Sequence, residues 1–343
     1  MKAIVYRQYG PPDVLRCEET EKPAPLGNEV LIEVRAASVN PMDCGLLKGK
    51  PYSIRLLLGP LKPRDTRPGR DVSGRVWAVG RNVTRFKPGD EVFGLCIDDP
   101  KGSGIAALSH CHGAFAEFAC VLESALALKP GDVTHEQAAA TPMAALTALQ
   151  GLHNHGRIQA GQKVLIHGAG GGVGTFAIQI AKAFAADVTG VSSTSNLELL
   201  RSIGADRVID YTREDYTRSA LHYDLILDCF ANRPLSAVRR VLNPGGFYVM
   251  VGGPPSRWML GLVARPLAAL TLSLFVGHKL TTLLTTPNQD DLGLIRDLIA
   301  AGKVTPVIDR CYHLSDISDA FRYLDERKAR GKVVITLSHG TSA

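Results

Sequence analysis

The fold is decided by residues 163–185, KVLIHGAGGGVGTFAIQIAKAFA. The first five residues form an apolar run typical of a buried strand, and residues 175–185 have the composition of a helix. Between them lie the glycines of Gly168–Gly174. A glycine loop between a strand and a helix is typical of dinucleotide-binding proteins, because glycine permits a tight turn and lets the backbone approach a pyrophosphate. The pyrophosphate then rests on the N-terminus of the helix.

Short strands and helices continue to alternate around this loop. We expect helices over 135–152, 196–203, 290–300 and 315–328, and strands over 188–191, 208–209, 225–228, 247–251 and 333–336. Strands that alternate with helices indicate right-handed βαβ units. The sequence therefore predicts an α/β fold with a doubly wound parallel sheet, the Rossmann arrangement.

The first 127 residues have a different, β-rich composition. Residues 30–34 and 74–79 have strand composition, and turn sequences such as Lys87-Pro88-Gly89-Asp90 separate these segments. Residues 50–69 carry several prolines, a leucine run and several basic side chains. We interpret this interval as a long irregular loop, and loops of that length are often functional lids.

Composition narrows the function classes. The chain has 343 residues, which corresponds to about two domains. Its net charge is +6, but the basic residues are scattered and no nucleic-acid-binding module is visible, so nucleic acid is not an expected partner. Seven cysteines, an odd number without a CxxC pair, indicate free thiols in a reducing compartment. The opening residues lack the apolar run of a signal peptide, so we expect a cytoplasmic protein.

The most apolar segment, residues 258–286, is interrupted by charged residues and a proline. Its uninterrupted stretch, residues 267–277, is shorter than a membrane span. We expect a buried helix followed by a strand over 272–278 at one edge of the nucleotide sheet. An exposed apolar edge invites aggregation, and pairing with a second copy around a twofold axis removes that hazard. The segment therefore predicts a homodimer and no stable membrane insertion.

The cofactor is indicated by the end of the strand that follows the glycine-loop helix. NAD-binding proteins place an Asp or Glu there, which binds the 2′-hydroxyl of the adenosine ribose. Here that position falls at about Ser192, in the hydroxyl-rich run VSSTSN of residues 191–196. The nearest acid, Asp187, lies at the opposite end of the strand, where we expect an exposed turn residue. A carboxylate would repel a 2′-phosphate, whereas hydroxyl groups can donate hydrogen bonds to it. NADPH is therefore favoured over NADH, although the loop contains no arginine.

Further motifs are spread over nearly the whole chain. They are SVNPMD at 38–43, PGRDVSG at 68–74, FKPGDEV at 86–92, GAFAE at 113–117, LTA at 146–148, GAD at 204–206, IDY at 209–211 and GKVV at 331–334. Together with the glycine loop, they resemble the medium-chain dehydrogenase/reductase superfamily, and within it the zeta-crystallin-like quinone oxidoreductases. The resemblance implies a GroES-like β-rich catalytic domain built from residues 1–127 and 288–343. It also implies a Rossmann NADPH-binding domain over 128–287 and an active cleft between the two domains.

The resemblance also bears on metals. Zinc-dependent members carry a His-Glu pair in the segment that here is Pro68-Gly69-Arg70-Asp71, and arginine has no lone pair for zinc. A structural zinc site needs four closely spaced ligands, whereas only three cysteines lie between residues 93 and 120. In His110-Cys111-His112, neighbouring side chains of an extended segment point in opposite directions. We therefore expect no metal site.

Without zinc, the chain has no Lewis acid to stabilise an alkoxide. Hydride delivery to an electron-poor acceptor still works, because such an acceptor needs orientation more than acid catalysis. The sequence therefore predicts hydride transfer from NADPH to a small hydrophobic acceptor, either a quinone or an α,β-unsaturated carbonyl. Two alternatives remain open. One is an NAD(P)-dependent alcohol dehydrogenase or aldehyde reductase, against which Arg70 argues, and the other is a non-catalytic, crystallin-like NADPH-binding protein.

The glycine pattern and the resemblance together give the expected site residues. Asn40 either contacts the reacting centre as the catalytic polar residue or caps the turn before Pro41. Asn196 stands where several relatives carry lysine. The expected cofactor-binding residues are Gly168, Gly171, Gly172, Val173 and Gly174 at the pyrophosphate, Ser192, Ser193 and Asn196 at the 2′-phosphate with Tyr211 stacking nearby, Asn232, Gly252 and Gly253 at the nicotinamide ribose, Thr147 at the carboxamide, and Lys332 returning from the C-terminal strand.

Overall fold

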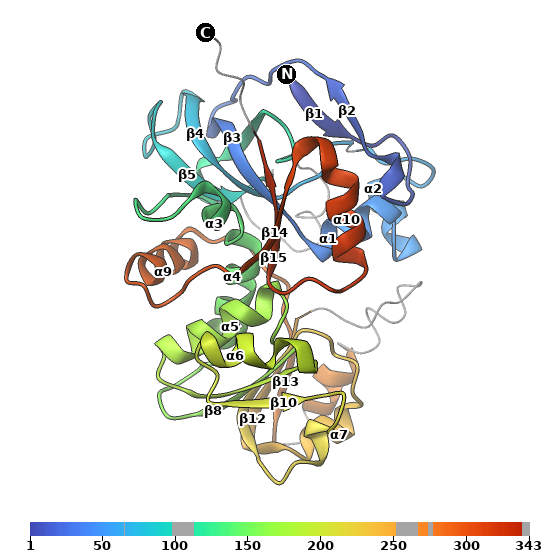
Figure 1. The fold of residues 1–343 in the computed structure, drawn as a ribbon, viewed down its shortest axis with the longest axis vertical. Coiled ribbons are helices and arrows are strands. Elements are labelled where there is room, and N and C mark those ends of the chain that lie inside the picture. The colour runs from blue at the N-terminus through green and yellow to red at the C-terminus, as the bar shows by residue number, and fades with distance from the viewer. Residues whose placement is uncertain (65, 98–112, 252–266, 274–276, 338–343) are drawn as a thin grey trace. The chain divides into compact units, whose positions relative to one another are not determined.

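The computed structural model describes residues 1–64, 66–97, 113–251, 267–273 and 277–337 (Figure 1). The chain forms two compact units. The first contains residues 1–143, 286–300 and 306–343, and the second contains residues 144–285 and 301–305.

The first unit is built on a seven-stranded sheet in the order β14-β15-β3-β4-β5-β7, with β6 paired to β3, and on a separate β1-β2 hairpin. Strand β15 comes from near the end of the chain and pairs antiparallel with β3, so distant parts of the sequence build one sheet. The strands expected over 30–34, 74–79 and 333–336 are confirmed. The strands are β1 (Lys2–Val5), β2 (Arg16–Glu19), β3 (Glu29–Val39), β4 (Asp71–Val79), β5 (Glu91–Leu95), β6 (Phe118–Leu122), β7 (Leu126–Leu128), β14 (Ile308–His313) and β15 (Lys332–Thr336).

Short helices cover this sheet. Within residues 50–69, the prediction of a wholly irregular loop is wrong, because residues 52–58 form a 3-10 turn and then helix α2. The run RLLL has good helix propensity, and the Arg55 guanidinium holds the carbonyls of Lys48 and Gly49 at 3.0 and 3.1 Å. The helices of this unit are α1 (Pro41–Lys48), α2 (Arg55–Leu58), α3 (His135–Ala139), α9 (Gln289–Ala300) and α10 (Ile317–Asp325).

The helix expected over 135–152 is divided. Helix α3 begins with a capping box between Thr134 and Gln137 and buries Ala139 against the first unit's sheet. A second helix, α4 (Pro142–Leu149), starts at a proline, which has no N–H to continue the preceding helix, and a π-helical turn over 150–155 follows it. The first unit therefore extends to Met143, beyond the expected boundary at residue 127.

The second unit contains a six-stranded, fully parallel sheet in the order β10-β9-β8-β11-β12-β13. This order confirms the doubly wound sheet, and its direction reverses between β8 and β11, where ligands bind in such folds. The strands are β8 (Lys163–His167), β9 (Asp187–Ser192), β10 (Arg207–Asp210), β11 (Tyr223–Asp228), β12 (Leu242–Met250) and β13 (Lys279–Thr282). The helices are α5 (Gly172–Ala183), α6 (Leu197–Ser202), α7 (Leu235–Arg239) and residues 267–273.

The edge strand of this sheet differs from the expected one. Leu272 and Ser273 end a helix, residues 274–276 lie outside the described residues, and the edge strand is β13. Ala269 is fully buried and Leu272 packs beside it, a spacing of three that places both on one helical face. Ser273 Oγ donates to the His278 carbonyl and accepts from the Leu280 N–H, which turns the chain into β13. An apolar run alone does not distinguish a helix from a strand.

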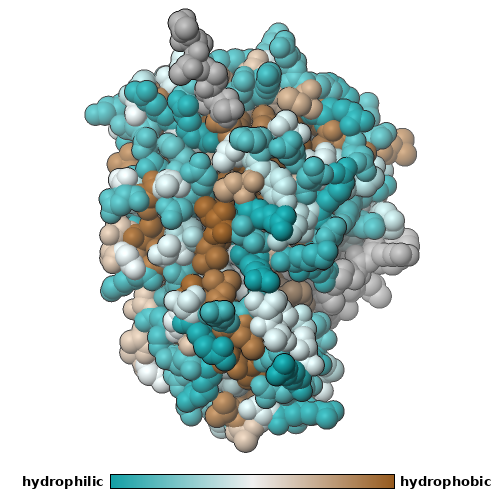
Figure 2. All heavy atoms as spheres, viewed as in Figure 1, coloured by the Kyte–Doolittle hydropathy of each residue, from teal (hydrophilic) through white to brown (hydrophobic). Residues whose placement is uncertain are grey.

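The apolar helix over 267–273 lies on the sheet with one face and meets solvent with the other. Leu267 and Leu270 are 53% and 60% exposed. Among the described residues, no helix has the length and apolar character needed to cross a membrane. Figure 2 shows a largely hydrophilic face on which hydrophobic side chains lie in separate patches.

Candidate functional site

The glycine loop joins β8 to α5 at the carboxyl end of the second unit's sheet. Gly168 has φ +83°, a left-handed conformation that favours glycine, and the N–H groups of Gly168 and Ala169 both donate to the Val191 carbonyl of β9. A Cβ on Gly174 would lie 2.5 Å from the Ala169 Cα, so the close packing of helix on loop requires glycine there. A Cβ on Gly171 would make only an ordinary van der Waals contact, 3.6 Å from the Gly168 carbonyl oxygen, so the position is not closely packed.

This loop fits an anionic group. Helix α5 begins at Gly172, so the first N–H groups of the helix, on Gly172, Val173 and Gly174, have no intrahelical partner. The helix dipole adds partial positive charge at the same end. The loosely packed Gly171 and the N-terminus of α5 therefore suit a pyrophosphate.

Three residues expected at the 2′-phosphate lie together at the end of β9. Asn196 Nδ2 donates to Ser192 Oγ at 3.0 Å and to Ser193 Oγ at 3.4 Å. A Cβ on Gly170 would lie 2.5 Å from Asn196 Nδ2, so these side chains rest against the glycine loop. Asn196 Oδ1 is buried without a hydrogen-bond partner in the described part of the chain, and a ribose hydroxyl is the kind of donor it lacks.

A carboxylate that sequence reasoning missed lies beside Ser192. Strand β10 pairs with β9 so that Asp210 stands opposite Ser192. Thr194 Oγ1 donates to one oxygen of Asp210, and the Thr212 hydroxyl and N–H donate to the other at 2.7 and 3.0 Å. The hydrogen bond from Thr194 is the largest cause that lowers the pKa of Asp210 below its usual value. Sequence reasoning examined the end of β9 alone, although the IDY motif at 209–211 marked the neighbouring strand.

Tyr211 and Arg213 follow Asp210 at the same end of the sheet. The Tyr211 N–H donates to the Ser192 carbonyl at 3.0 Å, and the Tyr211 side chain is half exposed. Arg213 Nε lies 3.6 Å from Asp210 Oδ2, and the Arg213 side chain is 77% exposed. The structure therefore brings Tyr211 to the expected phosphate residues and adds Asp210 and Arg213 to them.

A second missed group lies at the start of the glycine loop. His167 and Asp228 end the neighbouring strands β8 and β11, and His167 Nδ1 lies 2.8 Å from Asp228 Oδ1. Asp228 also accepts from the Tyr248 hydroxyl and from the N–H groups of Phe230 and Ala231. Burial would raise the pKa of Asp228, but the hydrogen bond from His167, with those from Ala231 and Tyr248, lowers it. The buried carboxylate therefore fixes the chain on both sides of the sheet's reversal point.

The other expected cofactor residues have mixed outcomes. Thr147 is buried in the second unit, where its hydroxyl lies 2.7 Å from that of Thr285. Asn232 is exposed just after β11. Gly252 and Gly253 lie outside the described residues.

Asn40 and Lys332 meet in a buried polar cluster of the first unit. Strands β15, β3 and β4 are neighbours, and their register brings Lys332, Asn40 and Asp71 to one end of the three strands. Lys332 Nζ donates to Asn40 Oδ1 at 2.6 Å and to Asp71 Oδ2 at 3.0 Å. Asp71 also accepts from Ser38 Oγ at 2.5 Å, from Asn40 Nδ2 at 3.0 Å and from the Met143 N–H at 2.8 Å.

Asn40 occupies the N-cap position expected of it, while its contact with the reacting centre stays a prediction. Its backbone lies at the N-cap of α1 and donates to the Asp43 carboxylate at 2.8 Å, while its side chain belongs to the Asp71 cluster. Burial raises the pKa of Asp43 to about 6, an effect that the nearby Arg70 opposes. Arg70 itself is only 3% exposed, so a cation occupies the segment in which zinc-dependent members carry a ligand.

Within the described residues, no group of three His, Cys, Asp or Glu side chains is placed to hold a metal ion. His110-Cys111-His112 lies outside those residues. The absence of a metal site stays a prediction that rests on the chemistry of Arg70.

Comparisons with known proteins agree with this fold. A family model for the alcohol dehydrogenase GroES-like domain matches residues 27–131, and one for zinc-binding dehydrogenase matches residues 203–335. The chain is 35% identical to 2-methylene-furan-3-one reductase of Solanum lycopersicum and 35% identical to the chloroplastic NADPH-dependent alkenal/one oxidoreductase of Arabidopsis thaliana. Each match covers 98% of this chain and 79% of the relative. The solved quinone oxidoreductase of Coxiella burnetii matches with a TM-score of 0.82 and 29% identity, over 98% of this chain and 99% of that one.

Proposed function

This chain belongs to the medium-chain dehydrogenase/reductase superfamily, among its quinone-oxidoreductase-like members, and we propose that it reduces a quinone or an α,β-unsaturated carbonyl with NADPH. The observation that carries the choice of acceptor is the buried Arg70. A cation at that position offers no lone pair to zinc, so the reaction proposed is one that needs no metal to stabilise an alkoxide.

The second unit supplies the nucleotide site. The glycine loop and the N-terminus of α5 suit the pyrophosphate, and the hydroxyl-rich end of β9 suits the adenosine ribose and its 2′-phosphate. Bound NADPH supplies the hydride. Asp228 holds the ends of β8 and β11 in place, which orients both the glycine loop and the segment that leads to Asn232.

The first unit supplies the polar group that we assign to the acceptor. Asn40 Nδ2 gives one N–H to Asp71 and carries a second N–H, which we assign to the carbonyl oxygen of the acceptor. Asp71 and Lys332 fix the amide in this orientation, since Lys332 occupies Oδ1 and Asp71 occupies one N–H. Lys332 is only 3% exposed, and we propose that its remaining N–H contacts the cofactor.

Consumption of NADPH against a panel of quinones, enones, aldehydes and alcohols tests the proposal. We expect turnover with quinones or enones, retained in the presence of a chelator. Turnover of alcohols alone, dependent on added zinc, would overturn it.

Assembly and location are further proposals. The apolar edge expected over 272–278 is replaced by β13, a short strand that carries Lys279, and charged residues protect exposed edges. We therefore propose that a homodimer forms through the exposed side chains of Leu267 and Leu270 instead. Light scattering on detergent-free protein tests it, and a monomer at all concentrations would contradict it. A cytoplasmic location rests on the free cysteines among the described residues, whereas the Arabidopsis relative is named as chloroplastic.

A further inference from the structure

The 2′-phosphate that distinguishes NADPH from NADH needs a positive charge, and residues 191–196 contain none. Their side chains offer hydroxyl groups and one amide, which bind a phosphate less strongly than a cation does. Asn196, in particular, is already committed to Ser192 and Ser193 through its Nδ2. The cation must therefore come from another segment.

The parallel pairing of β9 and β10 brings such a segment to the same place. Asp210 lies opposite Ser192, and the Tyr211 N–H donates to the Ser192 carbonyl. The N–H groups of Arg213 and Glu214 both donate to the Asp210 carbonyl at 3.0 Å, which folds the chain into a tight turn directly after β10. Arg213 is therefore held at the end of β10, beside the end of β9.

Side chains also join the two loops. Thr194, from the loop after β9, donates to the Asp210 carboxylate, and its hydroxyl lies 3.2 Å from that of Thr212 in the loop after β10. The two loops thus form one surface, and Arg213 is its cation. Within the described part of the chain, Arg213 makes no ion pair or hydrogen bond with its side chain other than the 3.6 Å pair with Asp210.

The negative charge of Asp210 is the reason why a 2′-phosphate at this site would need Arg213. Its carboxylate is ionised, only 6% of Asp210 is exposed, and its hydrogen-bond partners are neutral hydroxyl and N–H groups. Without a nearby cation, this charge would repel a 2′-phosphate bound at the end of β9. With Arg213 present, the local charge is balanced, and the Arg213 side chain is 77% exposed and therefore accessible to a ligand.

We propose that Arg213 determines the preference for NADPH over NADH, by neutralising Asp210 and donating to the 2′-phosphate. This inference rests on the proposed function. An arginine suits the role because its planar guanidinium binds two phosphate oxygens at once.

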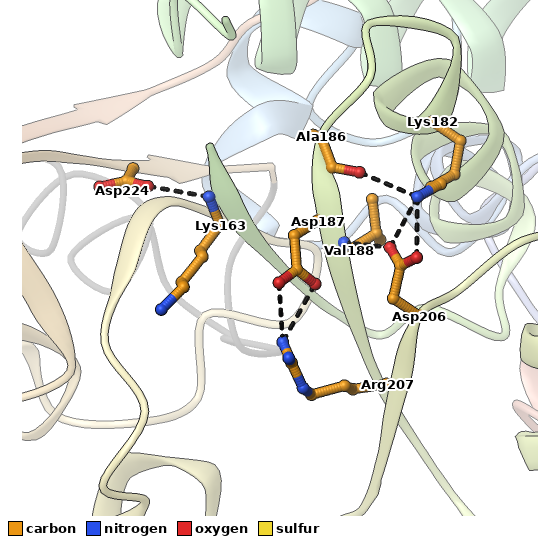
Figure 3. Close-up of polar contacts among 8 residues, drawn as sticks. All are labelled: Lys163, Lys182, Ala186, Asp187, Val188, Asp206, Arg207 and Asp224. Atoms are coloured by element: carbon orange, nitrogen blue, oxygen red, sulfur yellow. Dashed lines mark hydrogen bonds and ion pairs between the residues drawn. The ribbon is translucent and has the colours of Figure 1, made fainter. Parts of the chain in front are cut away.

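The same sheet provides a matched control. Arg207 begins β10, at the opposite end of the strand, and pairs with Asp187 at 2.8 Å (Figure 3). Arg207→Gln and Arg213→Gln each remove one positive charge from the same chain segment and break one ion pair with an aspartate. They differ in which end of the sheet loses the charge.

Fluorescence titration of both variants with NADPH and NADH, and displacement by 2′,5′-ADP, tests the proposal. We expect Arg213→Gln to bind NADPH and 2′,5′-ADP about tenfold more weakly, the loss of a charge-assisted phosphate contact, with NADH affinity within about twofold of wild type. Arg207→Gln should match wild type for all three ligands. Arg213→Lys, which keeps the charge, should retain most of the preference and guards against misfolding of the first variant.

The outcomes separate this inference from the proposed function. Wild-type protein that binds neither nucleotide would overturn the proposed function and the inference with it. Wild-type protein that prefers NADPH, with an Arg213→Gln variant that keeps the same preference or weakens both nucleotides equally, would overturn the role of Arg213 alone.

Discussion

The two ends of the parallel sheet in the second unit treat their aspartates differently. At the amino end, each carboxylate meets a basic residue or a backbone N–H at the surface (Figure 3). Asp187 pairs with Arg207, Asp206 pairs with Lys182 at 2.7 Å, and Asp224 accepts from the Lys163 N–H at 2.8 Å. At the carboxyl end, Asp210 and Asp228 are buried and their hydrogen bonds come from hydroxyl, N–H and imidazole groups, while Arg213 lies 3.6 Å from Asp210.

The charges at the amino end therefore lie on the surface, whereas those at the carboxyl end belong to the proposed nucleotide site. Exposed ion pairs contribute little to stability, so the amino end is tolerant of change. At the carboxyl end the acids order the loops, while the helix N-terminus and Arg213 stay available to an anion. Four substitutions and one control variant test this contrast.

Asp228→Asn should have the largest effect. The amide retains the shape but loses the charge that holds His167, Tyr248 and two backbone N–H groups, and we expect a loss of about 3 kcal/mol in the free energy of unfolding at pH 7. Urea denaturation measures it. An unchanged unfolding midpoint would show that the cluster is not stabilising.

The same variant has a defined pH dependence. Because the pKa of Asp228 is lowered in the folded protein, its stabilisation is fully present above the unfolded value of about 3.9 and is lost as the pH falls through the folded value. The stability difference between wild type and Asp228→Asn should therefore be constant from about pH 5 to 7 and shrink in more acidic buffer.

Gly174→Ala should have the next largest effect. Its Cβ would meet the backbone of Ala169, so we expect a loss of about 2 kcal/mol with impaired nucleotide binding. Gly171→Ala is the control, because its Cβ would make only an ordinary van der Waals contact, 3.6 Å from the Gly168 carbonyl oxygen. That variant should keep its melting temperature but bind nucleotide more weakly, since the methyl group enters the space assigned to the pyrophosphate. Equal destabilisation of both variants would contradict the packing argument.

Ser192→Asp should change selectivity more than stability. It places a second carboxylate beside Asp210 at the end of β9, and we expect the ratio of NADPH to NADH affinity to fall by about tenfold. Nucleotide titration at one fixed ionic strength measures this ratio for the variant and for wild type. A variant ratio equal to the wild-type ratio would contradict the assignment of Ser192 to the 2′-phosphate.

Arg207→Gln should have the smallest effect. Its pair with Asp187 is solvent-exposed, so the melting temperature should stay within about 2 °C of wild type. A larger decrease in thermal scanning would mean that the amino end also depends on its charges.

Local sequence pattern predicted most of the second unit. The strand–glycine–helix stretch over 163–185 and the alternating elements after it are found nearly as expected, because each element's period and turn residues are encoded within the element. The strand predicted over 272–278 was wrong because that apolar run is short, and only packing against the sheet selects a helix for Leu272.

The missed site residues share a different cause. Asp210 reaches Ser192 through the register of two strands, and Asp71 reaches Lys332 across the neighbouring strand β3. No local pattern contains that register. Asn40 and Lys332 were proposed separately as site residues, and only the sheet shows that their side chains are hydrogen-bonded to each other.

The pairing of β15 with β3 also sets an order of folding during synthesis. The second unit is nearly continuous in sequence and can assemble while the chain is still growing, since domains generally fold as units during synthesis. The sheet of the first unit is complete only with β15, which brings Lys332 to the buried carboxylate of Asp71. Until β15 is synthesised, residues 36–39 of β3 lack their partner on that edge and are open to chaperones or to other chains.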